Sequence, residues 1–161
     1  MRGEHRGPAD ALAGHRPSHR FRPPRFDHAF FPLHPNNPGS AFKDIITGTP
    51  DLLVRKNVNS SFHGTPDLHA WLQENDIREL VVCGITTNHC CETTARVGGN
   101  LGYRVYFPLD ATHTFDRTDP DGQNIPAAVL SRISGVNLHE EFATVVTTSD
   151  LLERSTQIPA R

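Results

Sequence analysis

The stretch Val81-Val-Cys-Gly-Ile-Thr-Thr-Asn-His-Cys-Cys-Glu-Thr-Thr-Ala-Arg96 decides how this chain folds. It joins a β-rich run that stops at Gly84 to a helix that we expect over residues 88–101, with Asn88 as its candidate cap. Cys90 then lies in the first helical turn, where partial positive charge and free backbone N–H groups favour a thiolate. A thiolate beside such amides has the parts needed for covalent acyl transfer. Packing as a small buried hydrophobe is the alternative for Cys90.

Predicted strands and helices alternate on the N-terminal side of this stretch. Residues 51–56 follow a Gly-Thr-Pro turn signal and are a short strand candidate. Thr65-Pro66-Asp67 has the pattern of a helix start, and Leu68, Trp71 and Leu72 then mark one helical face. Lys56 ends the strand candidate, so we expect it either at the same edge as Cys90 or as a solvated strand-end lysine.

The alternation continues on the C-terminal side. We expect strands over residues 103–109 and 143–147, a helix over residues 124–138 capped by Asn124, and a short final helix capped by Ser149. This order predicts an α/β fold with three layers (αβα) around a mostly parallel, Rossmann-like sheet. Ligands of such sheets bind beyond the carboxyl ends of the strands, which is where Cys90 stands.

Composition excludes several classes of protein. The chain of 161 residues is sized for one domain, and its net charge of −2 argues against a nucleic-acid partner. It has no apolar run long enough for a membrane span and no signal peptide. Its three cysteines, two of them adjacent, do not form a disulfide framework, so reduced thiols and a cytoplasmic location are expected.

The charge and proline distributions divide the chain. Residues 1–40 hold seven of the 13 prolines and have six arginines against three acidic residues, which is a net charge of +3, whereas residues 41–161 carry −5. We therefore expect an irregular Pro/Arg/His-rich leader over residues 1–35, disordered in one reading, ahead of a domain over residues 36–161. A shifted reading frame or a mistaken start is one hypothesis for the origin of this leader.

Three motifs together resemble the isochorismatase-like cysteine hydrolases. The first is the stretch 81–96 followed by Gly98-Gly-Asn-Leu-Gly-Tyr103. The second is Lys56-Asn-Val-Asn-Ser-Ser-Phe62 with Gly64-Thr65, and the third is Asp110-Ala-Thr-His-Thr-Phe-Asp116. They cover about residues 36–152, and their combination is far more specific than any one of them.

The resemblance implies a role for several residues. Cys90 matches the family's nucleophile and Lys56 its triad lysine. Ile85–Thr86 matches the site of a cis peptide bond without proline, which would turn the Thr86 amide toward the oxyanion beside the Cys90 amide. Cys91 stands where the family has an apolar residue, which favours packing.

Three further residues lie near the substrate pocket by their position in the motifs. They are Phe62, Asn88 and His89, and each has helix capping or core packing as its alternative. No metal is expected, because the ten histidines lack a recognisable ligand spacing, and no other cofactor is expected.

The family's third triad member, an aspartate on a first strand, has no counterpart. Asp27 is the nearest candidate, but its neighbours do not form a strand pattern. The resemblance therefore implies an N-terminally truncated, partial domain. Either the strand ending at Lys56 closes onto the strand at Val81, or strand edges remain exposed.

These observations predict a hydrolase that cleaves the C–N bond of a small amide or ureide through a thioester on Cys90. The expected partner is this small molecule, with no nucleic acid and no membrane, and a homo-oligomer is an open alternative. The rival hypothesis is a catalytically inactive remnant that serves as a binding or oligomerisation module. A redox switch between Cys90 and Cys91 is the weakest, because adjacent cysteines form strained disulfides.

Overall fold

The computed structural model describes residues 36–38, 41–42 and 44–156, so the leader of residues 1–35 lies outside the described residues. The helices are α1 (Leu68–Glu74), α2 (Glu92–Asn100), α3 (Ala127–Leu138) and α4 (Thr148–Thr156). The strands are β1 (Glu79–Val81), β2 (Gly84–Ile85), β3 (Arg104–Pro108), β4 (Thr112–His113), β5 (Arg117–Thr118), β6 (Asn124–Ile125) and β7 (Thr144–Val146). Three short turns complete the order: η3 (Ser61–His63), the π-helical η4 (Thr87–Cys91) and η5 (Leu109–Ala111).

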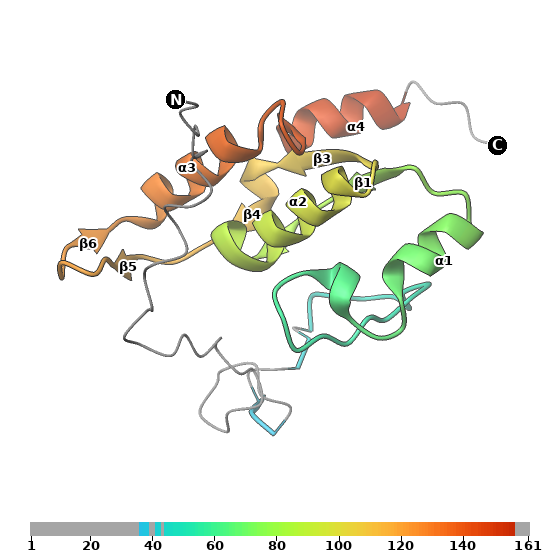
Figure 1. The fold of residues 1–161 in the computed structure, drawn as a ribbon, viewed down its shortest axis with the longest axis horizontal. Coiled ribbons are helices and arrows are strands. Elements are labelled where there is room, and N and C mark those ends of the chain that lie inside the picture. The colour runs from blue at the N-terminus through green and yellow to red at the C-terminus, as the bar shows by residue number, and fades with distance from the viewer. Residues whose placement is uncertain (1–35, 39–40, 43, 157–161) are drawn as a thin grey trace, which may run out of the picture.

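The main sheet has three parallel strands in the order β1-β3-β7. Leu80 of β1 pairs with Val105 of β3, and Phe107 of β3 pairs with Val145 of β7. β2 and β4 form a second parallel pair, and β5 and β6 form an antiparallel hairpin that extends past the start of α3 (Figure 1). The predicted mostly parallel α/β sheet is therefore confirmed.

Helices cover both faces of the main sheet. A Cβ placed on Gly98 of α2 would lie 3.2 Å from a methyl group of Val105, so α2 packs directly on that face. Tyr106 follows Val105 and points to the opposite face, because side chains alternate along a strand. There the Arg154 guanidinium of α4 lies 5.4 Å from the centre of the Tyr106 ring. The arrangement is the predicted three-layer order of helix, sheet and helix.

The core lies between α2 and the sheet. Ala95 of α2 and Phe107 of β3 have no exposed surface, and the other buried apolar residues gather around them: Leu72, Cys91, Tyr103, Val105, Leu138 and Ala143. Leu68 and Trp71 pack against this cluster, which confirms the apolar face predicted for α1. Among the helices that the structure describes, none has the length and apolar character needed to cross a bilayer.

The strand predicted over residues 51–56 is wrong. Within this segment only Arg55 forms a β-bridge, with Thr65 across the intervening turn, and none of these residues pairs with β1. The segment therefore makes a local loop instead of joining the sheet. Of the two alternatives for the sheet edge, the described residues correspond to the open one, because the side chain of Val81 is 54% exposed.

Helix boundaries differ from prediction because other side chains do the capping. α1 begins after Asp67, whose side chain accepts a hydrogen bond from the N–H of Ala70, and not at Thr65. α3 begins at Ala127, whose N–H donates to Asp116, so Asn124 is not its cap. At α4 the Thr147 hydroxyl accepts from the N–H of Asp150 and the Asp150 carboxylate accepts from the N–H of Thr147, in place of the predicted Ser149 cap. The Asp110 carboxylate also accepts from the N–H of Thr148.

Substitution of Gly99 tests the close approach of α2 to the residues before β7. A Cβ at this position would lie 2.5 Å from the carbonyl oxygen of Phe142. Gly-to-Ala substitution normally stabilises a helix by about 0.5–1 kcal/mol, but here we expect Gly99→Ala to destabilise the protein by about 1–3 kcal/mol because the backbone must shift. Urea denaturation measures the effect, with Asn100→Ala on the exposed side of α2 as the matched control. A stabilised Gly99→Ala variant would contradict this packing.

Candidate active site

The backbone changes direction at Gly84, between the end of β1 and the start of α2. Gly84 has a φ of 116°, a conformation that residues with a side chain rarely adopt. The chain then passes through β2, which pairs with β4, and enters η4 and α2. Cys90 thus lies in the opening turn of a continuous helical segment at the carboxyl edge of the sheet, as predicted.

A cis peptide bond joins Ile85 and Thr86, at the position that the family resemblance implies. The carbonyl oxygen of Thr86 accepts hydrogen bonds from the N–H groups of His89 and Cys91, each at 3.2 Å. Thr86 therefore stands at the N-terminal end of the helical segment, within one turn of Cys90. Ile85 points outward and is 54% exposed.

Asn59 connects the two candidate catalytic residues. The Cys90 thiol donates to the Asn59 side-chain oxygen with an Sγ–Oδ1 distance of 3.9 Å. The ammonium group of Lys56 donates to the backbone oxygen of the same Asn59 at 2.9 Å and to that of Val58 at 3.1 Å. Lys56 is exposed and belongs to a loop, not to the strand that we predicted. Lys56 and Cys90 therefore contact the same asparagine, one through its backbone oxygen and the other through its side chain.

Helix α2 holds this loop in place. The N–H of Ser61 donates to the Thr94 hydroxyl oxygen at 3.1 Å, and Thr94 lies one helical turn after Cys90. The side-chain oxygen of the buried Ser60 accepts a hydrogen bond from the N–H of Phe62 and caps the N-terminal end of η3. The thiol and the loop that faces it are therefore fastened to the same helix.

The two adjacent cysteines have different surroundings. Cys91 is 4% exposed and belongs to the core, whereas Cys90 is half-buried. Burial raises the pKa of the Cys91 thiol to about 12, the neighbouring Cys90 and Cys83 add to the rise, and Lys56 opposes it. Cys91 consequently remains a protonated packing residue at neutral pH.

The three predicted pocket residues are not placed alike. Phe62 stacks on the Tyr103 ring, with 5.7 Å between the ring centres, and packs against the core. Asn88 does not cap a helix, because its side-chain oxygen accepts a hydrogen bond of 2.6 Å from the Thr114 hydroxyl. His89 is the one of the three that lines the pocket described next.

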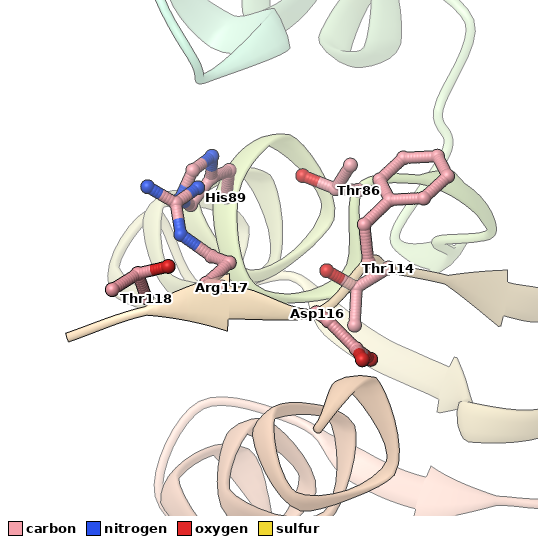
Figure 2. Close-up of a pocket in the computed structure, with 7 residues that line it drawn as sticks. Thr86, His89, Thr114, Asp116, Arg117 and Thr118 are labelled. Atoms are coloured by element: carbon pink, nitrogen blue, oxygen red, sulfur yellow. The ribbon is translucent and has the colours of Figure 1, made fainter. Parts of the chain in front are cut away.

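A polar pocket of about 330 Å³ opens beside the cis peptide bond. Thr86 and His89 line it from the helical turn, and residues 114–118 line it from the segment that leads into β5 (Figure 2). Arg117 approaches His89 with 3.0 Å between Nη1 and Nε2. Since arginine can only donate, the His89 Nε2 atom accepts this bond and carries no proton.

The pKa of His89 is lowered by burial and by the same contact with Arg117. Burial is the main cause that lowers the pKa of His89, the positive charge of Arg117 lowers it further, and the Glu92 carboxylate opposes the shift. His89 is therefore neutral at pH 7, and Arg117 carries the positive charge at this end of the pocket.

Asn59 and Arg117 are the site residues that sequence reasoning missed. Asn59 lies inside the quoted motif 56–62, but it is 31 residues from Cys90 in the sequence and meets it only because the loop folds back on α2. Arg117 immediately follows the motif 110–116, and this position beside the motif was the available signal. Within the described residues, no group of three or more His, Cys, Asp or Glu side chains is arranged to hold a metal ion.

Comparison with known proteins gives a family match over most of the chain. Residues 8–150 match the isochorismatase domain, and this match includes most of the proline- and arginine-rich leader. The uncharacterized isochorismatase family protein YrdC of Bacillus subtilis is 42% identical over 126 residues, which are 78% of this chain and 66% of that protein. Nicotinamidase 3 of Arabidopsis thaliana is 46% identical over 71 residues, which are 44% of this chain and 35% of that protein.

Solved structures agree with the sequence matches. The crystal structure of a cysteine hydrolase from Pseudomonas syringae pv. phaseolicola superposes with a TM-score of 0.71 at 32% identity. The superposition covers 78% of this chain and 59% of that one. This chain therefore spans about two thirds or less of the length of the proteins that it matches.

NMR titration of His89 tests the contact with Arg117. We expect a pKa below 6.5 in the unchanged protein, and Arg117→Gln should raise it while leaving it below 6.5, because burial is the larger cause. A folded-state pKa below the unfolded value means that the site contributes its full stability above pH 6.5 and loses it as the pH falls further. The readout is the imidazole Cε1–H shift, assigned with His89→Gln. A His89 pKa that is the same in Arg117→Gln and in the unchanged protein would contradict the contact.

Proposed function

We propose that this chain, which belongs to the isochorismatase family, is a hydrolase that cleaves the C–N bond of a small amide or ureide through a thioester on Cys90. The observation that carries the proposal is the place of Cys90, half-buried in the opening turn of the segment η4–α2, where its thiol contacts the Asn59 side chain and Lys56 binds the backbone of the same asparagine. The names nicotinamidase and cysteine hydrolase among its relatives support amide chemistry and a thiol nucleophile.

The proposed reaction has two steps. In the first, the Cys90 thiolate attacks the carbonyl carbon, a C–S bond forms, and the carbonyl electrons move to oxygen. When this oxyanion collapses, the C–N bond breaks and the nitrogen leaves as ammonia or an amine after it takes up the proton that the Cys90 thiol gave up. In the second, water attacks the thioester and the C–S bond breaks, so that the water's hydroxyl group completes the acid and its other proton returns to the Cys90 sulfur.

The oxyanion is proposed to form at the start of the helical segment. The backbone amides of Thr86 and Cys90 are the candidate donors, and the partial positive charge of the helix N-terminus adds to their effect. Support comes from the position of Thr86, whose carbonyl group is bonded to the N–H groups of the same turn and whose side chain reaches the adjacent pocket.

Lys56 is proposed to supply positive charge near Cys90 from the loop that contains Asn59. Its ammonium group donates to the backbone oxygens of residues 58 and 59, so it also holds the backbone of the asparagine whose side chain meets the thiol. Among the described residues, the hydrogen-bond partner of the Cys90 thiol is this amide and not a carboxylate. None of the described residues is thereby identified as the proton acceptor that the family resemblance assigns to an aspartate.

The second candidate function is a catalytically inactive module that binds a protein partner or its own copy. The observation that favours it is the outer edge of β1, where Val81 is 54% exposed, together with the equally exposed Ile85 of β2. The division of the chain at residue 36, into a leader and a hydrolase domain, likewise remains a prediction. Turnover assays separate the two functions, because a module of this kind releases no ammonia.

Ammonia release from a panel of small amides and ureides tests the thioester mechanism. We expect Cys90→Ser to reduce kcat by at least about a thousandfold, because the weaker nucleophile removes the covalent step. Cys91→Ala is the matched control, since the neighbouring thiol is assigned to packing only. Equal rates for the unchanged protein and Cys90→Ser would exclude the mechanism.

Alkylation by iodoacetamide tests whether Lys56 activates Cys90. The experiment uses a Cys83→Ser background, because Cys83 is exposed and would compete, whereas Cys91 is buried. We expect Lys56→Ala to slow the labelling of Cys90 near pH 7 by about fivefold, as loss of one nearby charge at a surface should. The chain's only other lysine, Lys43, supplies the control Lys43→Ala. An unchanged labelling rate in Lys56→Ala would show that Lys56 does not activate Cys90.

A further inference from the structure

The side-chain amide of Asn59 is the group that meets the Cys90 thiol. The distance from Sγ to Oδ1 is 3.9 Å, and both residues are half-buried. Among the residues that the structure describes, the thiol is the only hydrogen-bond partner of this amide. The amide is therefore committed to the proposed nucleophile and not to the packing of its own loop.

The loop that carries Asn59 is held on both sides of it. At its base, Arg55 and Thr65 exchange two backbone hydrogen bonds, each of 2.8 Å. Beyond Asn59, the N–H of Ser61 donates to the Thr94 hydroxyl oxygen of α2 at 3.1 Å. These bonds fix the backbone of the loop against the helix that carries the thiol, while the amide keeps its own rotation.

The charged groups around Cys90 have other hydrogen-bond partners. The ammonium group of Lys56 donates to backbone oxygens of its own loop, at 2.9 and 3.1 Å. Glu92 belongs to the same helical segment as Cys90, and its carboxylate accepts from Arg96 at 2.7 Å and from Ser134 at 2.6 Å. Both charges act on the thiol from a distance, whereas Asn59 is in contact with it.

Three further titratable side chains lie around Cys90. Burial raises the pKa of Cys91 to about 12, and burial together with Arg117 lowers the pKa of His89, so neither neighbour in the chain carries a charge at pH 7. The third is the exposed Cys83, beyond the end of β1, which contributes to the same rise in the pKa of Cys91. Around the thiol, a direct donor therefore has to come from the amide.

A primary amide can bond to sulfur in both of its protonation states. Its oxygen accepts from a thiol, which is the contact in the structure, and its nitrogen can donate to a thiolate. A half-turn about the bond between Cβ and Cγ exchanges the two atoms within the same space. Because a charge-assisted hydrogen bond is about twice as strong as a neutral one, the amide stabilises the thiolate more than the thiol.

We propose that Asn59 is a catalytic residue whose Nδ2 atom donates a hydrogen bond to the Cys90 thiolate and so favours the deprotonated, reactive form of the nucleophile. The thiol proton leaves to water, the amide turns from acceptor to donor, and it stays neutral throughout. The inference rests on the proposed hydrolase function for the reaction, and it adds the group that stabilises the attacking sulfur before the substrate binds.

Asn59→Asp is the decisive variant, because it keeps the shape of the side chain and replaces the donor by a carboxylate. The rate of Cys90 alkylation by iodoacetamide is followed against pH in a Cys83→Ser background, with the label located by mass spectrometry. We expect the midpoint of this profile to rise by about one pH unit or more in Asn59→Asp and by about half a unit in Asn59→Ala. Asn57→Asp, which adds the same charge at an exposed position of the loop, is the matched control and should shift the midpoint by less than half as much as Asn59→Asp.

Two results would overturn the role of Asn59. One is an unchanged midpoint in an Asn59→Asp protein whose circular dichroism matches that of the unchanged protein, because a purely structural asparagine tolerates its isostere. The other is an equal shift in Asn59→Asp and Asn57→Asp, which would reduce the effect to added charge.

The alkylation experiment needs no substrate, so it separates this inference from the proposed function. A midpoint that depends on Asn59, without ammonia release from any amide or ureide, would leave the bond to the thiolate standing and overturn the hydrolase. Ammonia release that depends on Cys90, with equal midpoints in Asn59→Asp and the unchanged protein, would support the hydrolase and overturn the role of Asn59.

Discussion

The close contact of α2 with its surroundings is the constraint on which the rest of the structure depends. Gly98 and Gly99 carry no side chain where the helix meets Val105 of the sheet and the backbone of Phe142. The helix can therefore pack closely against β3, and the turn before it reaches the carboxyl edge of the sheet with Cys90 half-buried. From this position α2 fastens the Lys56–Phe62 loop through Thr94 and fastens α3 through Glu92, whose carboxylate accepts a hydrogen bond of 2.6 Å from Ser134.

The candidate site has two ends that meet at one helical turn. Cys90 contacts Asn59, whose backbone also binds Lys56. The preceding residue, His89, contacts Arg117 and lines the polar pocket. Since a single turn carries both Cys90 and His89, the separation of these two groups of contacts depends on backbone geometry.

Sequence reasoning succeeded where the signal is local and failed where it depends on distant partners. The alternation of strands and helices, the apolar face of α1 and the helix-start position of Cys90 all follow from neighbouring residues, and the structure has them. The strand predicted over residues 51–56 failed, because a strand needs a pairing partner and the nearest one, Thr65, belongs to the same loop. Asp116 as the cap of α3 could not be predicted, because eleven positions separate it from Ala127.

In the segment 114–118, residues that hold the fold alternate with residues that only line the pocket. Thr114 is bonded to Asn88 and Asp116 caps α3, so a change at either position disturbs the fold. Phe115 and Arg117 stand between and beside them, are exposed, and contribute to the pocket lining without joining the core. Selection can therefore act on the two kinds of position separately. Changes at Phe115 or Arg117 can therefore alter the chemistry of the pocket without removing the hydrogen bonds that hold the surrounding scaffold.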